Sequence, residues 1–184
     1  MLEQRMPQQE KQKIQQNANC VVMVPPKEFA FNSQTAQDNE FQNQVVETTA
    51  EIRAAAMREF HSMVEQLRDV GVQVVVFDYP VGEIETPDAV FPNNWFSTTQ
   101  GGALYTFPMA CENRQNEVKV AALAEALKQA KRPVLSQDSL ISYLDQNAFL
   151  ESTGVMVKDH ISRTIYAALS QRCCLLYTTD AADE

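Results

Sequence analysis

The segment that decides the fold is TPDAVFPNNWFS, residues 86–97. It places an acid, Asp88, two adjacent side-chain amides, Asn93 and Asn94, and the only tryptophan of the chain on one short stretch. A glycine turn and the apolar run 103–109 follow it, so we expect the segment to lead into a β-hairpin. The polar side chains then lie beside a strand, and this placement indicates the floor of a binding site.

A simple turn is the alternative interpretation of this segment, because Pro, Asp and Asn are the residues that turns favour. The aromatic neighbours Phe91, Trp95 and Phe96 favour binding instead. They would shield the polar groups from water, which strengthens the hydrogen bonds made there and penalises ligands that do not match them.

Outward from this segment, the chain alternates strands and helices. Helical spacing of apolar residues predicts helices over 47–70 and 117–131. Short apolar runs predict strands over 20–24, 72–77, 103–109, 133–135, 149–150, 155–157 and 164–169, with the last two forming a hairpin. These elements recur at intervals of roughly 50 to 60 residues, which indicates an α/β protein with a repeat architecture.

Composition limits the function. A chain of 184 residues with 45% hydrophobic content can form one domain with a real core. A net charge of -9 argues against nucleic acid or an anionic membrane as partner, so we expect a small-molecule ligand. Residues 1–19 are polar and predict a disordered arm, neither a signal peptide nor an anchor. The four cysteines lack disulfide or metal spacing, which is typical of reduced thiols in the cytoplasm.

Other candidate residues are scattered. Arg114 precedes the second helix and could hold a carboxylate, although a lone arginine is usually only solvated. Glu151 could orient a catalytic base, or be an ordinary acid at a strand end. His61 and His160 have no partner at ligand spacing. No phosphate-binding glycine loop and no metal-ligand cluster is present, so we expect neither a metal nor a cofactor.

Four motifs in order carry a family resemblance: TPDAVFPNNWFS, NRQNEV at 113–118, LESTG at 150–154 and ALSQR at 168–172. Over residues 20–172 the chain resembles the guanidine-modifying enzymes of the pentein superfamily. It is most similar to the citrulline-utilisation hydrolase and amidinotransferase-like group, related to dimethylarginine dimethylaminohydrolase. The resemblance implies a pseudo-fivefold α/β propeller of ββαβ modules, of which this chain holds roughly the first half.

The resemblance also implies residue roles. The family hydrolyses a guanidine or ureido carbon through a Cys nucleophile and a His acid/base. Asp88 matches the acid that receives the α-amino end of an amino-acid substrate, and Asn93 and Asn94 match the pair that receives the guanidinium. Arg114 and Arg172 match the carboxylate-binding arginines, and Glu151 matches the acid beside the catalytic His.

Two departures from the family follow. The dimethylarginine enzymes have acidic residues at the positions that match Asn93 and Asn94. Two amides suit a neutral ureido group, such as that of citrulline, better than a guanidinium cation. The catalytic His and Cys lie downstream of the ALSQR position in the family, so neither His160 nor the pair Cys173 and Cys174 matches them.

The last stretch, CLLYTTDAADE, resembles the translation of a sequencing-library transposon end with Thr179 as the single difference, so we expect 173–184 to be a non-native tail. The leading hypothesis is therefore the N-terminal part of a guanidine or ureido hydrolase, itself without the catalytic dyad. A non-catalytic amino-acid-binding module and an unrelated α/β domain are the alternatives, and the oligomeric state stays open.

Overall fold

The computed structural model describes residues 18–36, 47–142, 147–159, 162 and 164–174. Strands, helices and the short 3-10 helix η1 follow one another along the chain. In order they are β1 (Cys20–Met23), α1 (Thr49–Asp69), β2 (Gln73–Val76), η1 (Pro92–Asn94), β3 (Phe96–Thr98), β4 (Ala103–Thr106), α2 (Glu112–Gln115), α3 (Val120–Gln129), β5 (Ser136–Ser139), α4 (Ser152–Val155), β6 (Met156–Asp159) and β7 (Thr164–Ala167).

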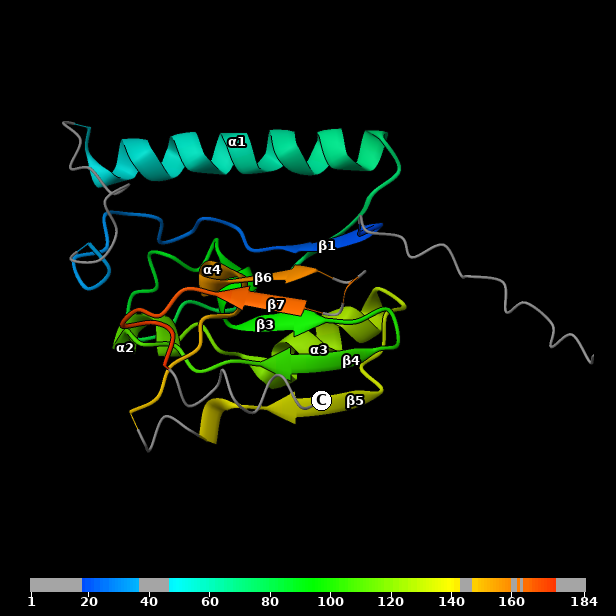
Figure 1. Cartoon of the computed structure of the whole chain (residues 1–184). Coiled ribbons are helices and arrows are strands. Elements are labelled where there is room, and N and C mark those ends of the chain that lie inside the picture. The colour runs from blue at the N-terminus through cyan, green and yellow to red at the C-terminus, as the bar shows by residue number, and fades with distance from the viewer. Residues whose placement is uncertain (1–17, 37–46, 143–146, 160–161, 163, 175–184) are drawn as a thin grey trace, which may run out of the picture.

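The first unit is β1–α1–β2, and it confirms the predicted strand, helix and strand. β1 and β2 pair in parallel, and α1 connects them and lies above β1 in Figure 1. The helix begins with a capping box, in which the Thr48 side chain accepts a hydrogen bond from the Glu51 N–H and the Glu51 carboxylate accepts one from the Thr48 N–H. Phe60 and Val64 of the helix are buried against Val74 of β2.

The second unit is β3–β4–α3–β5, a ββαβ arrangement. The predicted hairpin is confirmed, because β3 pairs antiparallel with β4 in the register Phe96↔Thr106. Gly102 adopts φ +83° in its turn, a conformation that a side chain disfavours. α3 is shorter than the helix predicted over 117–131, and residues 112–115, which lie before that range, form the short helix α2.

The strand predicted at 133–135 is wrong in position. β5 lies at Ser136–Ser139, all four residues are exposed, and it pairs in parallel with β4. Its polar sequence SQDS carries no apolar signal, because backbone pairing alone makes it a strand. Leu135, which suggested the earlier position, is 75% exposed.

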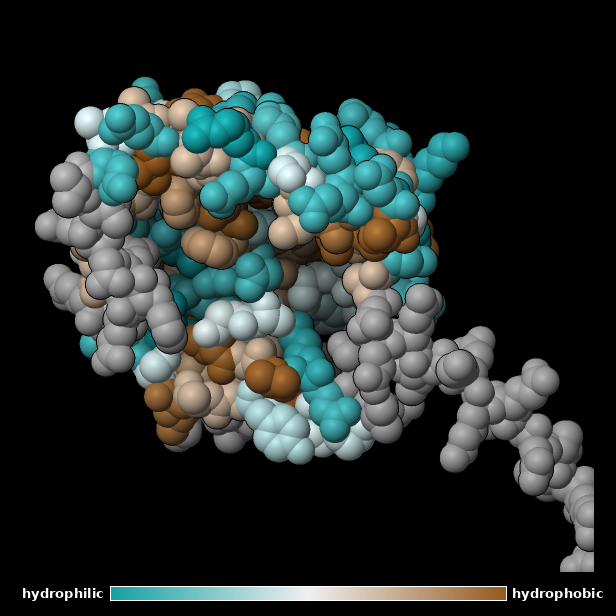
Figure 2. Space-filling view, turned by 90° about the horizontal axis from the view of Figure 1, so that it is seen from above, coloured by the Kyte–Doolittle hydropathy of each residue, from teal (hydrophilic) through white to brown (hydrophobic). Residues whose placement is uncertain are grey.

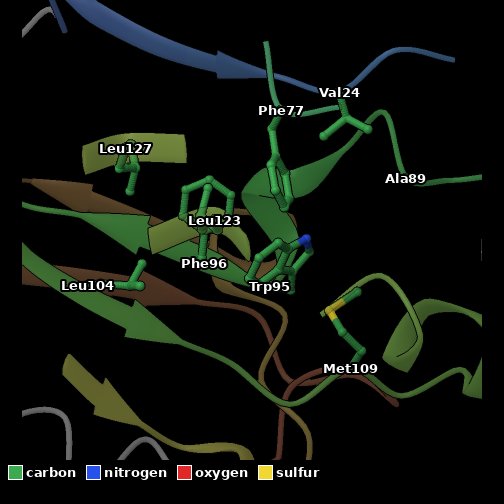
Figure 3. Packing of buried hydrophobic residues seen from close by; sticks show 9 residues of the cluster. All are labelled: Val24, Phe77, Ala89, Trp95, Phe96, Leu104, Met109, Leu123 and Leu127. Carbon is green, nitrogen blue, oxygen red and sulfur yellow. The ribbon is translucent and has the colours of Figure 1, made fainter. Parts of the chain in front are cut away.

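The main core lies between these two units. Trp95 is 1% exposed and packs against Phe77 and Phe96, with ring centroids 6.5 and 4.7 Å away (Figure 3). Leu104 of β4 and Leu123 of α3 are fully buried beside them. The sequence segment 86–97 is thus anchored to the core by its tryptophan.

The third unit is the antiparallel hairpin of β6 and β7, which confirms the prediction for 155–157 and 164–169. Leu150, expected in a strand, makes only an isolated bridge to Cys173. Met156 of β6 joins Phe107, Leu150 and Cys173 in a smaller buried cluster. On the opposite face of the hairpin the paired residues Val157 and Tyr166 are exposed, and Ile165 and Leu169 are exposed as well.

The fold is therefore of the expected mixed α/β class, with sheets of two, three and two strands in the described residues. These sheets do not close into a ring within the described part of the chain, so the propeller architecture stays a prediction. No helix in the described ranges is both long and apolar enough to cross a membrane. Figure 2 looks onto the α1 side and shows a mostly hydrophilic surface with a hollow near its middle.

Candidate functional site

Polar side chains from distant parts of the chain meet where the short helices η1, α2 and α4 gather. Figure 1 shows α2 and α4 on the same side of the molecule, near the arrowheads of β4 and β7. The sequence segments that supply these residues are 28–36, 86–94, 110–117 and 151–154, together with Arg172. Most of these residues are buried, so their polar groups need hydrogen-bond partners within the protein.

Asp88 is the first of the expected site residues, and it is 5% exposed. Its Oδ2 accepts hydrogen bonds from Asn32 Nδ2 at 2.7 Å and from Thr35 Oγ1 at 3.0 Å. The turn that carries it is closed by the Ala89 N–H bonded to the Thr86 carbonyl. Two donors on one oxygen fix the direction of this carboxylate. Asn32 and Thr35 were not predicted as site residues, because their segment has only the composition of a loop.

Asn93 and Asn94 lie in η1 and face different surroundings. Asn94 is buried, and its Nδ2 donates to Glu151 Oε2 at 3.4 Å. Asn93 is exposed, and its Nδ2 donates to Thr153 Oγ1 at 2.9 Å. A Cβ atom on Gly154 would lie 2.7 Å from Asn94 Nδ2, so only glycine allows this approach of α4 to η1. The two amides are therefore held by α4 on one side.

Glu151 is fully buried and joins three segments. Its Oε1 accepts from the Ala110 N–H at 3.1 Å, and its Oε2 lies 3.7 Å from Arg172 Nη1. The Glu151 N–H also donates to the Arg172 carbonyl at 3.2 Å. Asn94, Glu151 and Arg172, which the family resemblance selected, are thus brought together by the fold.

Ser152 follows Glu151 with the unusual backbone angle φ 33°. Its side chain is fully buried, and its Oγ has no hydrogen-bond partner among the described residues. The residue therefore combines backbone strain with an unpaired polar group directly beside the buried acid.

Arg114 takes a different position from the one expected of a solvated or carboxylate-binding arginine. It is 3% exposed, and its Nε and Nη2 donate to the two oxygens of Glu117, each at 3.0 Å. Nη2 also donates to the carbonyls of Asp88 at 3.3 Å and Phe91 at 3.2 Å. The guanidinium thus ties the backbone of the 86–97 segment to Glu117, which sequence analysis placed only as the start of a helix.

The charges of this pair are perturbed by their surroundings. Burial raises the pKa of Glu117 to about 7, while its bonds to Arg114 act in the opposite direction. Asp88 and Glu151 also act on it and raise the pKa further, so both carboxylates lie within electrostatic range of the pair. Burial opposes the charge on Arg114, but the bond to Glu117 outweighs it and raises the arginine pKa. Asp88, Arg114, Glu117 and Glu151 therefore form one electrostatic cluster.

The aromatic wall expected around the polar groups is only partly present. Phe91 is 49% exposed, so it does not enclose them. Trp95 and Phe96 are buried, but they belong to the core. Phe91 precedes η1, Trp95 follows it and Phe96 begins β3, so the three side chains do not form one wall.

The remaining candidates lie away from this cluster or outside the described residues. His61 is exposed on α1 and stacks edge-on with Phe60, while His160 lies outside the described residues. Cys173 is 1% exposed, and burial raises the pKa of its thiol, which is unlike an activated nucleophile.

A comparison with protein families decides the relationship. The model of the family described as N,N dimethylarginine dimethylhydrolase, eukaryotic, matches residues 25–183. The chain belongs to this family. The resemblance to the guanidine-modifying enzymes is thereby confirmed. The match includes most of 173–184, and 175–184 lie outside the described residues, so the non-native tail stays a prediction.

Solved structures show a similar fold. One is the N-terminal domain of ArgZ, an arginine dihydrolase from the ornithine-ammonia cycle in cyanobacteria, solved bound to substrate. It matches with a TM-score of 0.60 at 16% identity, and the match covers 89% of this chain and 54% of that domain. The apo structure of ArgZ has a TM-score of 0.58 at 18% identity, covering 89% of this chain and 22% of that chain. This member of the dimethylarginine family therefore spans about half of the ArgZ domain. No curated protein matches the chain.

Proposed function

We propose that this chain is the substrate-binding part of a hydrolase that acts on the guanidine or ureido carbon of an arginine-like amino acid. The observation that carries the proposal is the meeting of Asn94, Glu151 and Arg172 at one point. Asp88 lies close by, since Asp88 and Glu151 both act electrostatically on Glu117. Family membership supports the reaction class, and the substrate-bound ArgZ structure supports an arginine-like ligand.

Each residue takes a role that its chemistry allows. Asp88 receives the α-ammonium group, because its carboxylate is already oriented by two donors. Asn93 and Asn94 face the ureido or guanidinium end. Arg172, whose side chain is 27% exposed, is better placed for a substrate carboxylate than Arg114, which is buried in its pair with Glu117.

Glu151 orients a catalytic His in this proposal, and the His and the Cys nucleophile are supplied by sequence beyond residue 172. The thiolate of that Cys attacks the guanidine or ureido carbon, and the His protonates the departing ammonia. Water then attacks the amidino or carbamoyl carbon left on sulfur, which breaks the carbon–sulfur bond and returns the thiolate. The exclusion of Cys173 from this role is supported by its burial and raised thiol pKa.

The architecture that suits this role is a propeller whose modules surround the site. The β3–β4–α3–β5 unit supports it, because it has the ββαβ order of one module. We propose that further modules follow this half and cover the exposed side of the β6–β7 hairpin.

Citrulline is the proposed substrate within this class. Two amides can both donate and accept, which matches a neutral ureido group, whereas a guanidinium would lose the carboxylates that pair with its charge. Tighter binding of arginine than of citrulline by the full-length protein would remove this preference.

The test of the reaction is ammonia release. The product of the gene extended beyond residue 172 is assayed with arginine and with citrulline, and a variant lacking the downstream Cys serves as control. We expect ammonia from at least one substrate and none from the control. Release from neither, together with retained binding, would favour a non-catalytic amino-acid-binding module.

A further inference from the structure

A chain of hydrogen bonds runs from Asp88 to Asn113, and its direction is fixed at the Asp88 end. An ionised carboxylate only accepts hydrogen bonds, so the Asn32 group that faces it is the NH2 of its amide. The Asn32 Oδ1 must then face the other way. It accepts there from the Gln34 N–H at 3.1 Å and from Asn113 Nδ2 at 2.8 Å.

This direction determines what Asn113 presents next. Its Nδ2 is used on Asn32, so its carbonyl oxygen, Oδ1, is left as an acceptor. The side chain is 7% exposed, and Oδ1 has no hydrogen-bond partner among the described residues. A buried acceptor without a donor is costly, and such groups in native proteins call for an explanation.

The position of Asn113 is also held from its own backbone. Its N–H donates to Gln34 Oε1 at 3.1 Å, and it directly precedes Arg114 in α2, where Arg114 pairs with Glu117. The unpaired oxygen is therefore part of a preorganised arrangement, in which a ligand loses less entropy on binding.

We propose that Asn113 is a second binding residue for the ammonium group of the amino-acid ligand, with its Oδ1 accepting one N–H beside Asp88. The inference rests on the proposed function, since it concerns the same site. A ligand group that satisfies Oδ1 must be a donor, and an ammonium group has three N–H donors while a carboxylate has none. Glu117 is paired with Arg114 and Glu151 lies 3.7 Å from Arg172, so the third acid of the cluster, Asp88, favours a cation here.

The test compares four ligands on the wild-type 184-residue chain and on its Asn113→Leu variant, with binding measured by titration calorimetry. The ligands are citrulline and arginine, each with its des-amino counterpart, which lacks only the ammonium group. We expect Asn113→Leu to weaken binding of the amino acids by about tenfold or more, the effect of losing a hydrogen bond to a charged group. Binding of the des-amino ligands changes by less than about twofold, a difference within the scatter of neutral contacts.

Asn116→Leu is the matched control, because Asn116 lies in the same segment and its side chain donates to the carbonyl of the exposed Glu112 rather than to the Asp88 network. It should leave all four affinities unchanged. A second variant, Asn113→Asp, keeps the size of the side chain and serves if the leucine variant does not fold. Its added negative charge should weaken the des-amino ligands, which lack an ammonium group, more than the amino acids.

Equal weakening of both ligand types would show a merely structural role and overturn the inference. Unchanged affinity in both Asn113 variants would overturn it too, because it would mean that the ligand donates no hydrogen bond to Oδ1. Both outcomes leave the proposed function intact. If the wild-type chain binds none of the four ligands, the proposed function itself is contradicted.

Discussion

Arg114 donates from two nitrogens to the two carboxylate oxygens of Glu117, and both side chains are buried. The same guanidinium holds the carbonyls of Asp88 and Phe91. The pair therefore fixes the loop that carries the proposed ammonium-binding acid. We expect the pair to affect ligand binding only by positioning Asp88. Its effect on stability can be measured separately.

Glu117→Ala should destabilise the chain by about 3–5 kcal/mol, because it leaves a buried guanidinium without its carboxylate. The control is Glu125→Ala, which removes an exposed ion pair to Lys128 at 3.6 Å and should cost less than about 0.5 kcal/mol. Urea unfolding followed by circular dichroism gives both values. Similar midpoints for the two variants would contradict the structural role of the buried pair.

The stability of the chain should depend on pH through Glu117. Its pKa is raised to about 7 from the ordinary value of 4.5, chiefly by burial. The folded chain then binds a proton between these pH values that the unfolded chain has lost, so the contribution is full below pH 4.5 and disappears as the pH rises through about 7. The free energy of unfolding of the wild type minus that of Glu117→Gln should fall across this window. A flat or rising difference would sink this prediction.

Gly154→Ala should displace Asn94. The new Cβ would lie 2.7 Å from Asn94 Nδ2, and such overpacking costs about 1–3 kcal/mol. Gly82→Ala is the control, since nothing lies within 4 Å of a Cβ at that position. Thermal unfolding of the two variants checks the difference. Equal midpoints would show that α4 does not pack on η1 as closely as described.

Ser152→Gly should raise the unfolding midpoint. Glycine relieves the positive φ of 33°, and the change removes the buried unpaired hydroxyl, with a combined effect of about 1–2 kcal/mol. Ser152→Ala removes only the hydroxyl and should give a smaller increase. A glycine variant less stable than the alanine variant would mean that the backbone at this position is not strained.

Strong periodic signals made much of the fold predictable. The long amphipathic α1 and the hairpin after Trp95 were correctly placed, because apolar spacing and glycine turns are local properties of the sequence. β5 was misplaced, since its exposed polar residues form a strand only through pairing with β4. Pairing between distant segments leaves no local pattern to read.

The candidate site divides in the same way. Motif order in the family selected Asn94, Glu151 and Arg172, which the structure brings together. Asn32 and Asn113 were not selected as site residues, because their contacts join residues far apart in the sequence. Polar residues of this kind look like ordinary loop residues until their partners are known.

The most direct test of the central claim, that these segments form one amino-acid site, is the binding of citrulline and arginine to the 184-residue chain and to its Asp88→Asn variant by titration calorimetry. Removal of the carboxylate that faces the ammonium group should weaken binding by about tenfold or more. The account predicts binding of at least one amino acid by the wild type and this loss in the variant. No binding by the wild type, or equal affinity in the variant, would contradict it.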